Sequence, residues 1–474
     1  MKKLLIIICL FCTTFLFSSC KKDNISPFVF VDYKDGVELY KYISDELYVK
    51  SIDIPDEYNG KKVIRIEDAA FDDVYSIKEI KLPEHLEEIG EDVFNGIKEI
   101  SLKNIPNTIS IVGPSILASE QVSRYNLLKG NQEFNVTDEA IFSKDGTTLI
   151  SYNPSRESEE YTTPKGVKVI AENAFFDAKN LKKVVISEGV ETIEHNAFLN
   201  CTKLIDISFP KSLKHMEADS LSETKWYEKQ KGEVTINGKF LIKETENVGQ
   251  QYKIPDGITH LLCNFYDYEN DDNEEMSPYL SVLTLPKSLE YISPDVDLSN
   301  VSVYYIEEGN ESFVIDSGAF VYNKDKTKLI IYSKGNVTKL ALEDNIKIIG
   351  EYAFNFSNVS NLTLPDSVER VEKYAFASSN LKKINIPKNL KTIEEGTFTG
   401  CYEMKECKLP NSVESIERYA FSDIEDLEIT IPNSVKYIHP QAFDGVENLK
   451  IIGERNSFAE KYAEIFDIDF EEIG

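Results

Sequence analysis

The sequence predicts a repeat solenoid that is mostly β with short helical or 3-10 turns, and two recurring landmarks support this fold class. One is a phenylalanine, usually after alanine or valine, that returns every 22 or 23 residues. The other is a proline that closes an apolar-x-apolar step. The phenylalanines are Phe71, Phe94, Phe175, Phe198, Phe354, Phe376, Phe398, Phe421 and Phe443, and the prolines are Pro83, Pro210, Pro286, Pro365, Pro387, Pro410 and Pro432.

Each part of the repeat has a physical reason, which the unit at 381–401 illustrates. Ile384 and Ile386 point inward and the residue between them points outward, because side chains alternate along a strand. Pro387 lacks an N–H and ends that strand, and Phe398 fills the interior behind it. One such loop buries too few apolar side chains to offset the entropy of ordering its backbone. Several copies must therefore stack to fold.

The units "LKKINIPKNLKTIEEGTFTGC" (381–401) and "LKKVVISEGVETIEHNAFLNC" (181–201) indicate a leucine-rich-repeat solenoid with strands on its concave side. They resemble the BspA-like surface-antigen family, the Treponema-type leucine-rich repeat. The resemblance implies a right-handed superhelix with β-hairpin inserts. It also implies an opening segment at 50–63, and a closing cap at 457–473 made of a short amphipathic helix and a strand.

Hairpins are predicted where the repeat is interrupted. "IFSKDGTTLISY" (141–152) and "FVYNKDKTKLIIY" (320–332) are copies of each other, so that Asp145 corresponds to Asp325, Leu149 to Leu329 and Tyr152 to Tyr332. A third hairpin is expected around Asn237-Gly238, since Asn-Gly favours a tight hairpin turn. The acidic stretch 269–275 is expected to be an exposed loop.

The N-terminus predicts export. Lys2 and Lys3 precede an apolar run and the small residues Ser18-Ser19, which is the pattern of a secretory signal peptide. Residues 16–20, Leu-Phe-Ser-Ser-Cys, resemble the bacterial lipobox, and the resemblance implies a lipid anchor on Cys20. An ordinary signal peptide that ends near Ser19 is the alternative. The expected location is the bacterial outer membrane, lipid-anchored, at the cell surface.

These landmarks predict the following division of one continuous solenoid. The segments are a signal peptide at 1–19, a lipid anchor and tether at 20–27, an N-terminal cap with first repeats at 28–115, a hairpin insert at 116–160, central repeats at 161–225, irregular repeats with hairpin inserts at 226–340, C-terminal repeats at 341–456 and a C-terminal cap at 457–474.

Composition argues against several function classes. The net charge is −29, and a polyanion repels nucleic acid and anionic lipid, so membrane contact is expected only through the lipid anchor. The sequence lacks Gly-x-Ser-x-Gly, a phosphate-binding glycine loop and His-Glu-x-x-His. The histidines have no metal-ligand spacing, and Cys201, Cys263, Cys401 and Cys407 suit buried thiols. We therefore expect no enzyme, cofactor or metal site.

The candidate ligand-binding surface consists of outward positions on the predicted concave strands. Lysine there would attract carboxylates or sulfates, although it could also serve only to keep open strands soluble. The residues are Lys78, Lys81, Lys182, Lys183, Lys382, Lys383, Asn385, Lys405 and Lys408.

A second pattern is a glutamate after the inward isoleucine or its equivalent. It could bridge divalent cations, but a solvated flank is the favoured interpretation. Its members are Glu67, Glu194, Glu217, Glu372, Glu394 and Glu417.

The family resemblance implies an adhesin that binds host matrix proteins, host cells or other bacteria, so the expected partners are host or bacterial surface proteins. The alternative is a glycan-capturing accessory lipoprotein of a nutrient-uptake system, which would need exposed aromatic platforms. A structural envelope protein without a ligand is a third hypothesis.

Overall fold

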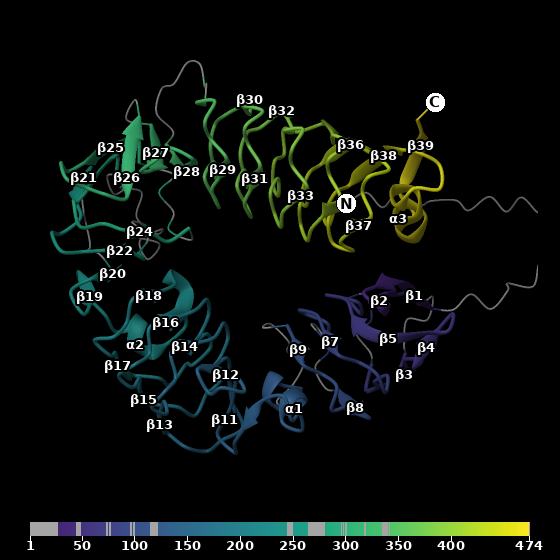
Figure 1. Ribbon diagram of the computed structural model, residues 1–474, viewed down its shortest axis with the longest axis horizontal. Helices are drawn as coiled ribbons and strands as arrows, with labels where there is room; N and C mark the ends of the chain where they lie inside the picture. The colour runs from purple at the N-terminus through teal and green to yellow at the C-terminus, as the bar shows by residue number, and fades with distance from the viewer. Residues whose placement is uncertain are drawn as a thin grey trace, which may run out of the picture.

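The computed structural model shows the repeats following one another around a ring whose two ends meet (Figure 1). It describes residues 27–473 except 44–48, 73, 75–76, 95–96, 98–99, 114–121, 244–249, 264–279, 295, 297, 299–300, 317–318, 334–339 and 341. The predicted signal peptide, Cys20 and the acidic stretch 269–275 lie outside the described residues. Among the residues described, no helix has the length and apolar character needed to cross a membrane.

Each repeat contributes two short strands, and these form two rows of parallel strands. The strands of the apolar-x-apolar step lie on the outer circumference of the ring, and the shorter strands that follow line its inside (Figure 1). The outer strands are β3 (Ser51–Asp53), β6 (Glu79–Lys81), β8 (Ser101–Lys103), β13 (Glu160–Thr162), β15 (Lys183–Val185), β17 (Asp206–Ser208), β21 (Gln251–Lys253), β23 (Val282–Leu285), β25 (Val303–Ile306), β30 (Asn361–Thr363), β32 (Lys383–Asn385), β34 (Glu406–Lys408), β36 (Asp426–Ile431), β38 (Asn448–Gly453) and β39 (Asp469–Glu472).

The inner row consists mainly of two-residue strands. They are β5 (Lys61–Ile66), β7 (Glu88–Ile89), β9 (Ile111–Val112), β14 (Val169–Ile170), β16 (Thr192–Ile193), β18 (His215–Met216), β22 (His260–Leu261), β24 (Tyr291–Ile292), β29 (Ile348–Ile349), β31 (Arg370–Val371), β33 (Thr392–Ile393), β35 (Ser415–Ile416) and β37 (Tyr437–Ile438). The short strand β4 (Glu57–Tyr58) pairs with β5 within the predicted opening segment.

The repeat solenoid is therefore confirmed, but its predicted curvature is wrong. The apolar-x-apolar strands are convex, not concave (Figure 1). The inner rows of distant repeats also face each other. Burial raises the pKa of Glu172, which follows inner strand β14, and Lys373, which follows inner strand β31, is close enough to be among the cations that oppose this shift. The sign of the curvature depends on how groups of repeats meet, which the repeat pattern itself does not encode.

The described chain divides into four blocks, and each begins with an antiparallel hairpin that extends the inner row. The hairpins are β1 (Phe28–Tyr33) with β2 (Gly36–Tyr42) in block 1, β11 (Ala140–Phe142) with β12 (Thr148–Tyr152) in block 2, β19 (Val234–Ile236) with β20 (Phe240–Lys243) in block 3, and β27 (Phe320–Asn323) with β28 (Lys328–Tyr332) in block 4. Two of them gain a third strand, β10 (Asn135–Val136) or β26 (Phe313–Asp316). All three predicted hairpins are confirmed, and the first hairpin was not predicted.

Each hairpin carries a β-bulge at the same place, which leaves one residue of the second strand without a register partner. The four bulge residues are Tyr40, Ile150, Ile242 and Ile330. Ile150, Ile242 and Ile330 each pack into the apolar core of the preceding block. Tyr40 belongs to the first block and packs into the core of the last one, block 4. The meeting of block 4 with block 1, which we call the seam, is thus a fourth junction of the same kind.

The phenylalanines form columns inside the blocks. In block 4 the rings of Phe354, Phe376, Phe398 and Phe421 are stacked with centroids 5.0–5.5 Å apart. Because each loop is too small to fold alone, this column and the strand ladders hold neighbouring loops together. A tyrosine of the hairpin's second strand begins each of three columns. The ring centroids of Tyr42, Tyr152 and Tyr332 lie 5.8, 5.3 and 5.1 Å from that of the first phenylalanine in the column.

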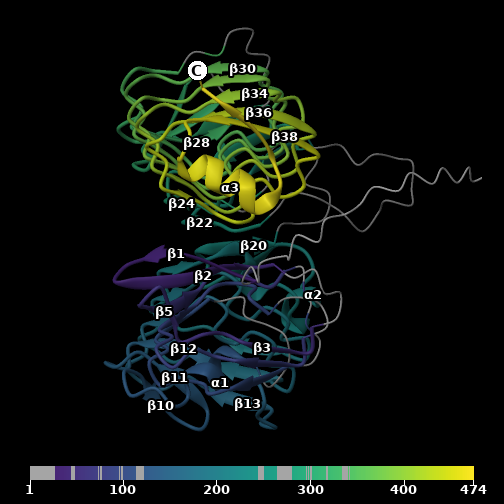
Figure 2. The same ribbon diagram turned by 90° about the vertical axis from the view of Figure 1, so that its right-hand side faces the viewer.

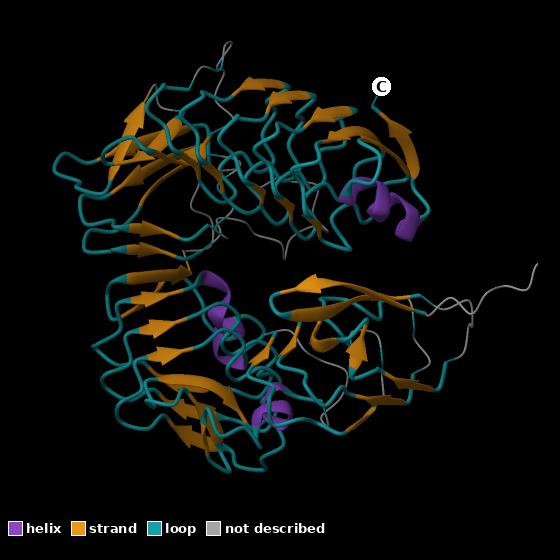
Figure 3. Cartoon of the chain, turned by 45° about the vertical axis from the view of Figure 1, so that its right-hand side comes forward, coloured by secondary structure: helices purple, strands orange, loops and turns teal. Residues whose placement is uncertain are grey.

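Three short α-helices and one 3-10 turn lie among the described residues. They are α1 (Arg124–Leu128), α2 (Lys225–Glu228), α3 (Phe458–Phe466) and η1 (Ala218–Leu221). The helices are purple against the stacked strands in Figure 3. The predicted closing cap is confirmed, since α3 begins at the N-cap Ser457 and β39 pairs in parallel with β38.

The four described cysteines are buried free thiols, as predicted. Cys201 and Cys401 occupy one repeat position and donate to the carbonyls of Phe175 and Phe376 in the preceding repeats. Burial raises the pKa of Cys201 to about 12 and that of Cys401 to about 11, so both remain protonated near neutral pH.

Candidate functional site

The predicted lysine surface lies on the outer circumference of the ring, in or directly before strands β6, β15, β32 and β34. These strands belong to blocks 1, 2 and 4, so the structure places the residues in three separate groups around the ring and not in one patch (Figure 1). We call these residues the outer lysine rows.

Most of these lysines pair with a carboxylate one repeat away. Lys81 lies 2.8 Å from Asp53, Lys183 lies 3.4 Å from Asp206, and Lys383 lies 2.7 Å from Glu406. Lys182, Lys382 and Lys405 make similar pairs with Glu159, Glu403 and Asp426. Exposed pairs of this kind contribute about 0.2–1 kcal/mol each, so the rows are an exposed pattern of alternating charge.

Asn385, also predicted to bind a ligand, has a structural role. Its Oδ1 accepts a hydrogen bond from the backbone N–H of Leu364 at 2.8 Å, and its Nδ2 donates to the carbonyl of the same residue at 3.0 Å. The amide therefore satisfies the end of the neighbouring strand, where the ladder would otherwise leave these groups open.

The glutamates after the inner strands also serve the backbone. Glu194 accepts a hydrogen bond from the N–H of Glu172 at 3.0 Å, and Glu372 accepts one from the N–H of Glu351 at 3.1 Å. Both carboxylates reach back to the turn of the preceding repeat. Glu67, at the start of the same series, is completely buried. The favoured interpretation of a solvated flank is thus wrong for Glu67, whereas Glu194 and Glu372 are half-buried.

A cluster of charged side chains lies at the seam. Arg65 of β5 places Nη1 2.6 Å from both Glu38 Oε2 and Glu67 Oε2, and Nη2 3.3 Å from Asp68 Oδ1. Burial and the neighbouring Glu67 raise the pKa of Glu38 to about 8. Burial disfavours the charge of Arg65, but the carboxylates of Glu67 and Glu38 outweigh it and raise the pKa of the guanidinium.

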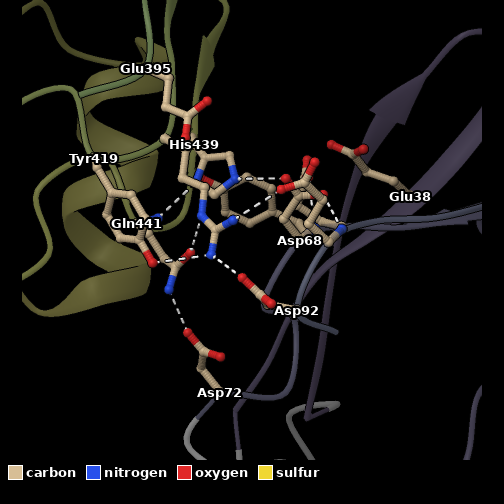
Figure 4. Close-up of polar contacts among 12 residues, drawn as sticks. Glu38, Asp68, Asp72, Asp92, Glu395, Tyr419, His439 and Gln441 are labelled. Atoms are coloured by element: carbon tan, nitrogen blue, oxygen red, sulfur yellow. Dashed lines mark hydrogen bonds and ion pairs between the residues drawn. The ribbon is translucent and has the colours of Figure 1, made fainter. Parts of the chain in front are cut away.

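Four residues of block 4 reach this cluster and its surroundings from across the seam (Figure 4). The hydroxyl of Tyr437 donates to Glu67 at 2.8 Å. Arg418 donates from Nη2 to Asp92 at 2.7 Å and from Nη1 to Glu91 at 3.3 Å. The remaining two residues are Gln441, which donates to Asp72 at 2.6 Å, and His439, which faces Asp68.

Apolar contacts complete the seam. Tyr40 is fully buried, its hydroxyl donates to the carbonyl of Ile438, and its ring lies 6.5 and 6.4 Å from those of Phe458 and Phe466 in α3. Figure 2 shows block 4, in green and yellow, above block 1, with α3 facing β2. The seam thus combines an aromatic cluster with a buried polar network.

Three possible metal ligands meet at the seam: Glu67, Asp68 and His439 each offer an atom, all within 4.8 Å of one another. His439 Nδ1 accepts the N–H of Gln441 at 3.0 Å, so the proton of the neutral ring is on Nε2, 3.5 Å from Asp68 Oδ2. Arg65 already binds both carboxylates. A metal ion would have to displace the Nε2 proton and compete with Arg65 for both carboxylates.

Sequence reasoning missed the seam. In the sequence Glu67 is one glutamate of a series, and neither Arg65 nor Arg418 is part of a predicted site. Arg65 lies in inner strand β5 and Arg418 follows Glu417 after inner strand β35, so the two arginines stand at different repeat positions. Arg370 of β31 occupies the same position as Arg65, so no repeat pattern marks the two residues of the seam.

Comparison with known proteins supports the family resemblance. A family model described as a BspA type leucine rich repeat region with 6 copies matches residues 38–154, 151–268 and 325–450. No curated protein matches the chain.

Several solved structures are similar to the chain. A leucine rich cell surface protein from Faecalibacterium prausnitzii is 17% identical, with 93% of this chain and 96% of that chain covered and a TM-score of 0.38. The pneumococcal vaccine antigen PcpA is 18% identical, with 94% and 96% covered and a TM-score of 0.36. A leucine-rich repeat protein from Bacteroides ovatus is 19% identical, with 96% and 100% covered and a TM-score of 0.27.

Proposed function

The chain belongs to the BspA-type leucine-rich-repeat family, and from that premise we propose that it is a lipid-anchored bacterial surface protein that binds other macromolecules through its repeat surface. The partner class that we propose is a protein of the host matrix, of a host cell or of another bacterium, which makes the chain an adhesin. The anchor is proposed from Ser18-Ser19-Cys20 in the sequence.

The observation that supports this function is the regular array of side chains on the outer strands. In β13, β17, β30 and β34 the middle residue is buried and both neighbours are exposed. Parallel pairing aligns these exposed positions, so that Asn361 lies opposite Lys383 and Thr363 opposite Asn385. Rows of side chains about 4.8 Å apart suit an extended polypeptide partner with alternating charge.

Charge reversal tests the outer lysine rows. Binding of the protein to immobilised collagen, fibronectin and laminin would be compared with that of a quadruple variant carrying Glu at Lys182, Lys183, Lys382 and Lys383. Because these pairs are exposed, the variant should remain folded, and binding to the recognised matrix protein should fall at least tenfold. The matched control is a double variant with Glu at Lys214 and Lys391, which form similar exposed pairs just before inner strands.

Retained binding by the quadruple variant would reject the rows as the binding surface. No binding to any of the three matrix proteins would reject the matrix-adhesin proposal itself.

The anchor has a separate test. Replacement of Cys20 by Ser should abolish incorporation of labelled palmitate and release the chain from the membrane fraction. Unchanged labelling in that variant would reject lipidation at this residue.

Glycan capture, the alternative predicted from the sequence, would need neighbouring exposed aromatic side chains. Tyr402, at 63% exposed, and Tyr305, at 59%, are the most exposed aromatic residues of the described chain, and they lie in different blocks. This distribution favours protein binding, and a polysaccharide array would test the alternative directly.

A further inference from the structure

The histidines of the chain gather at one junction. His195 and His215, from neighbouring repeats of block 2, place Nε2 atoms 3.9 and 2.7 Å from the carboxylate of Glu217. His260 of block 3 lies beside His215. The sequence gives no sign of this group, because only the stacking of repeats brings its members together.

His215 and His260 meet where block 2 ends and block 3 begins (Figure 1). His215 belongs to β18, the last inner strand of block 2, and His260 belongs to β22, which pairs with β20 of block 3. Their ring centroids are 5.9 Å apart. Tyr291 of β24 contacts both rings, with centroids 4.8 Å from His215 and 5.4 Å from His260. The inner row therefore passes between the blocks through three rings, and we call the contact of His215 with His260 the histidine joint.

His260 is enclosed by this contact. It is 8% exposed, and Phe240 of β20 packs against it with ring centroids 4.7 Å apart. Its Nδ1 lies 2.9 Å from the hydroxyl oxygen of Thr259. A buried imidazole among other rings loses much of the hydration that would stabilise its charged form, so the packing favours the neutral form.

Three charged groups act on His260 from the elements packed against it. His215 lies in β18, Glu217 follows β18, and Lys239 precedes β20. Burial, together with His215 and Lys239, lowers the pKa of His260 from an ordinary 6.5 to about 4, and Glu217 opposes this shift. Glu217 is already bonded to His215 Nε2 at 2.7 Å and to the Tyr291 hydroxyl at 3.0 Å. The one carboxylate of the three is thus committed to the neighbours of His260.

The buried histidine of the seam has a different setting. His439 is 3% exposed, and its Nε2 faces Asp68 Oδ2 at 3.5 Å, so a charge on this ring would lie next to a carboxylate. Burial and Glu67 raise the pKa of Glu38 at the seam to about 8, so this group is already protonated in acid. Acidification therefore creates a pair of like charges at the histidine joint and a pair of opposite charges at the seam.

We propose that the histidine joint is an acid-sensitive hinge of the ring. When His215 and His260 both carry a charge, the two cations repel each other and His260 must reach water. Strands β22 and β24 then move away from β18 while the seam stays closed. This device goes beyond the proposed binding function and does not depend on any of the proposed partners.

The direction of the pH effect follows from His260. Between pH 4 and 6.5 the unfolded or opened chain binds a proton at this residue that the closed joint does not bind. The contribution of His260 to the stability of the closed joint is therefore fully present above pH 6.5 and is lost as the pH falls toward 4.

Small-angle scattering of the unaltered protein between pH 7 and 4 tests the hinge. The radius of gyration should rise as the pH falls, return to its first value at pH 7, and change while the far-ultraviolet circular dichroism stays constant. Hydrogen exchange, corrected for the effect of pH on the intrinsic rate, locates the opening. Amides of β22 and β24 should lose protection before those of β35 and β37 at the seam.

Two variants separate the joint from general acid unfolding. His260→Phe keeps an aromatic ring between Phe240 and Tyr291 but cannot take up a proton, so its radius of gyration should stay constant down to pH 4. His215→Gln keeps a donor for Glu217 and removes the second cation, so its transition should move to lower pH. His85→Gln is the matched control, because His85 is a half-buried histidine in block 1, and its transition should be unchanged.

Three results would overturn the proposal. They are a constant radius of gyration in the unaltered protein, a transition that both His260→Phe and His215→Gln leave unchanged, and a loss of protection that begins in β35 and β37. If His260→Phe does not fold, His215→Gln decides alone, and an unchanged transition in that variant overturns the hinge. No ligand is present in these measurements, so their failure leaves the test of the outer lysine rows unaffected.

Discussion

The seam and the junction between blocks 3 and 4 solve the same packing problem in different ways. At the seam the bulge residue Tyr40 is fully buried between two rings of α3, and a network around Arg65 crosses from one block to the other. At the other junction the bulge residue Ile330 borders an open cavity, and the residues described there include no helix. One contact is closely packed and polar, and the other is incomplete.

The difference follows from chain connectivity. Blocks 3 and 4 are joined by a short segment, so their effective concentration for each other is high whether or not the contact is complete. Blocks 4 and 1 lie at opposite ends of the chain, and Arg418 and Asp92 are 326 residues apart. Only noncovalent contacts hold the seam closed, so we infer that an incomplete junction is tolerated where the chain is continuous and not where the ring must close.

Arg65→Met is expected to have the largest effect on this comparison. The substitution leaves the buried carboxylate of Glu67 without its cation and the carboxyl group of Glu38 without its hydrogen-bond partner. Removal of one partner from a buried charge pair typically costs about 3–5 kcal/mol. Urea unfolding should show this loss, and small-angle scattering should show a larger radius of gyration as the ring opens.

Arg156→Met is the control for Arg65→Met, because Arg156 makes a partly exposed pair with Glu139 at 3.0 Å. It should change the unfolding free energy by no more than about 1 kcal/mol. A closed ring of undiminished stability in Arg65→Met would show that the polar network is not what holds the seam.

The two bulge residues provide a matched pair of smaller changes. Tyr40→Ala removes a buried aromatic side chain and a hydrogen bond, so a cost of about 3–5 kcal/mol is expected, with opening of the solenoid ring. Ile330→Ala enlarges a cavity that already exists, and its cost should fall at or below about 2 kcal/mol, with the ring unchanged. Unfolding and scattering measurements on both variants check the contrast, which equal costs or two unchanged shapes would contradict.

Local sequence was enough to predict the repeats, three of the four hairpins and the closing cap. The period of Phe376 and Phe398 follows from the size of one loop, and the correspondence of Tyr152 with Tyr332 follows from two copies of one hairpin. The thiols of Cys201 and Cys401 were predictable because they share a repeat position. In each case the residues that determine the structure lie within one or two repeats of each other.

The seam and the curvature were not predictable in this way. Tyr40 and Ile438 are 398 residues apart, and no repeat relates them. The inner or outer position of a strand depends on the angle at which blocks meet, which many small contacts determine together. The outer lysine rows were therefore placed on the correct strands but on the wrong side of the ring.

The pH dependence of the seam offers a graded test. Burial and Glu67 raise the pKa of Glu38 from an ordinary 4.5 to about 8, so the folded ring holds a proton that the unfolded chain has released. The contribution of Glu38 to the free energy of unfolding is therefore fully present below pH 4.5 and is lost as the pH rises toward 8. One proton gives a slope of at most about 1.4 kcal/mol per pH unit. Asp68, whose pKa is lowered mainly by His439 and Arg65 against the effect of burial, acts only at lower pH.

Glu38→Gln removes this titration, so urea midpoints measured between pH 5 and 8 should fall less steeply in the variant than in the unaltered protein. A part of the slope should remain, because burial and Asp68 raise the pKa of Glu91 to about 7. Glu160→Gln, at an exposed position of β13, should leave the slope unchanged. An identical slope in Glu38→Gln would place the titrating group elsewhere. A reduced slope would show that the seam tolerates this buried carboxyl group because the group stays protonated.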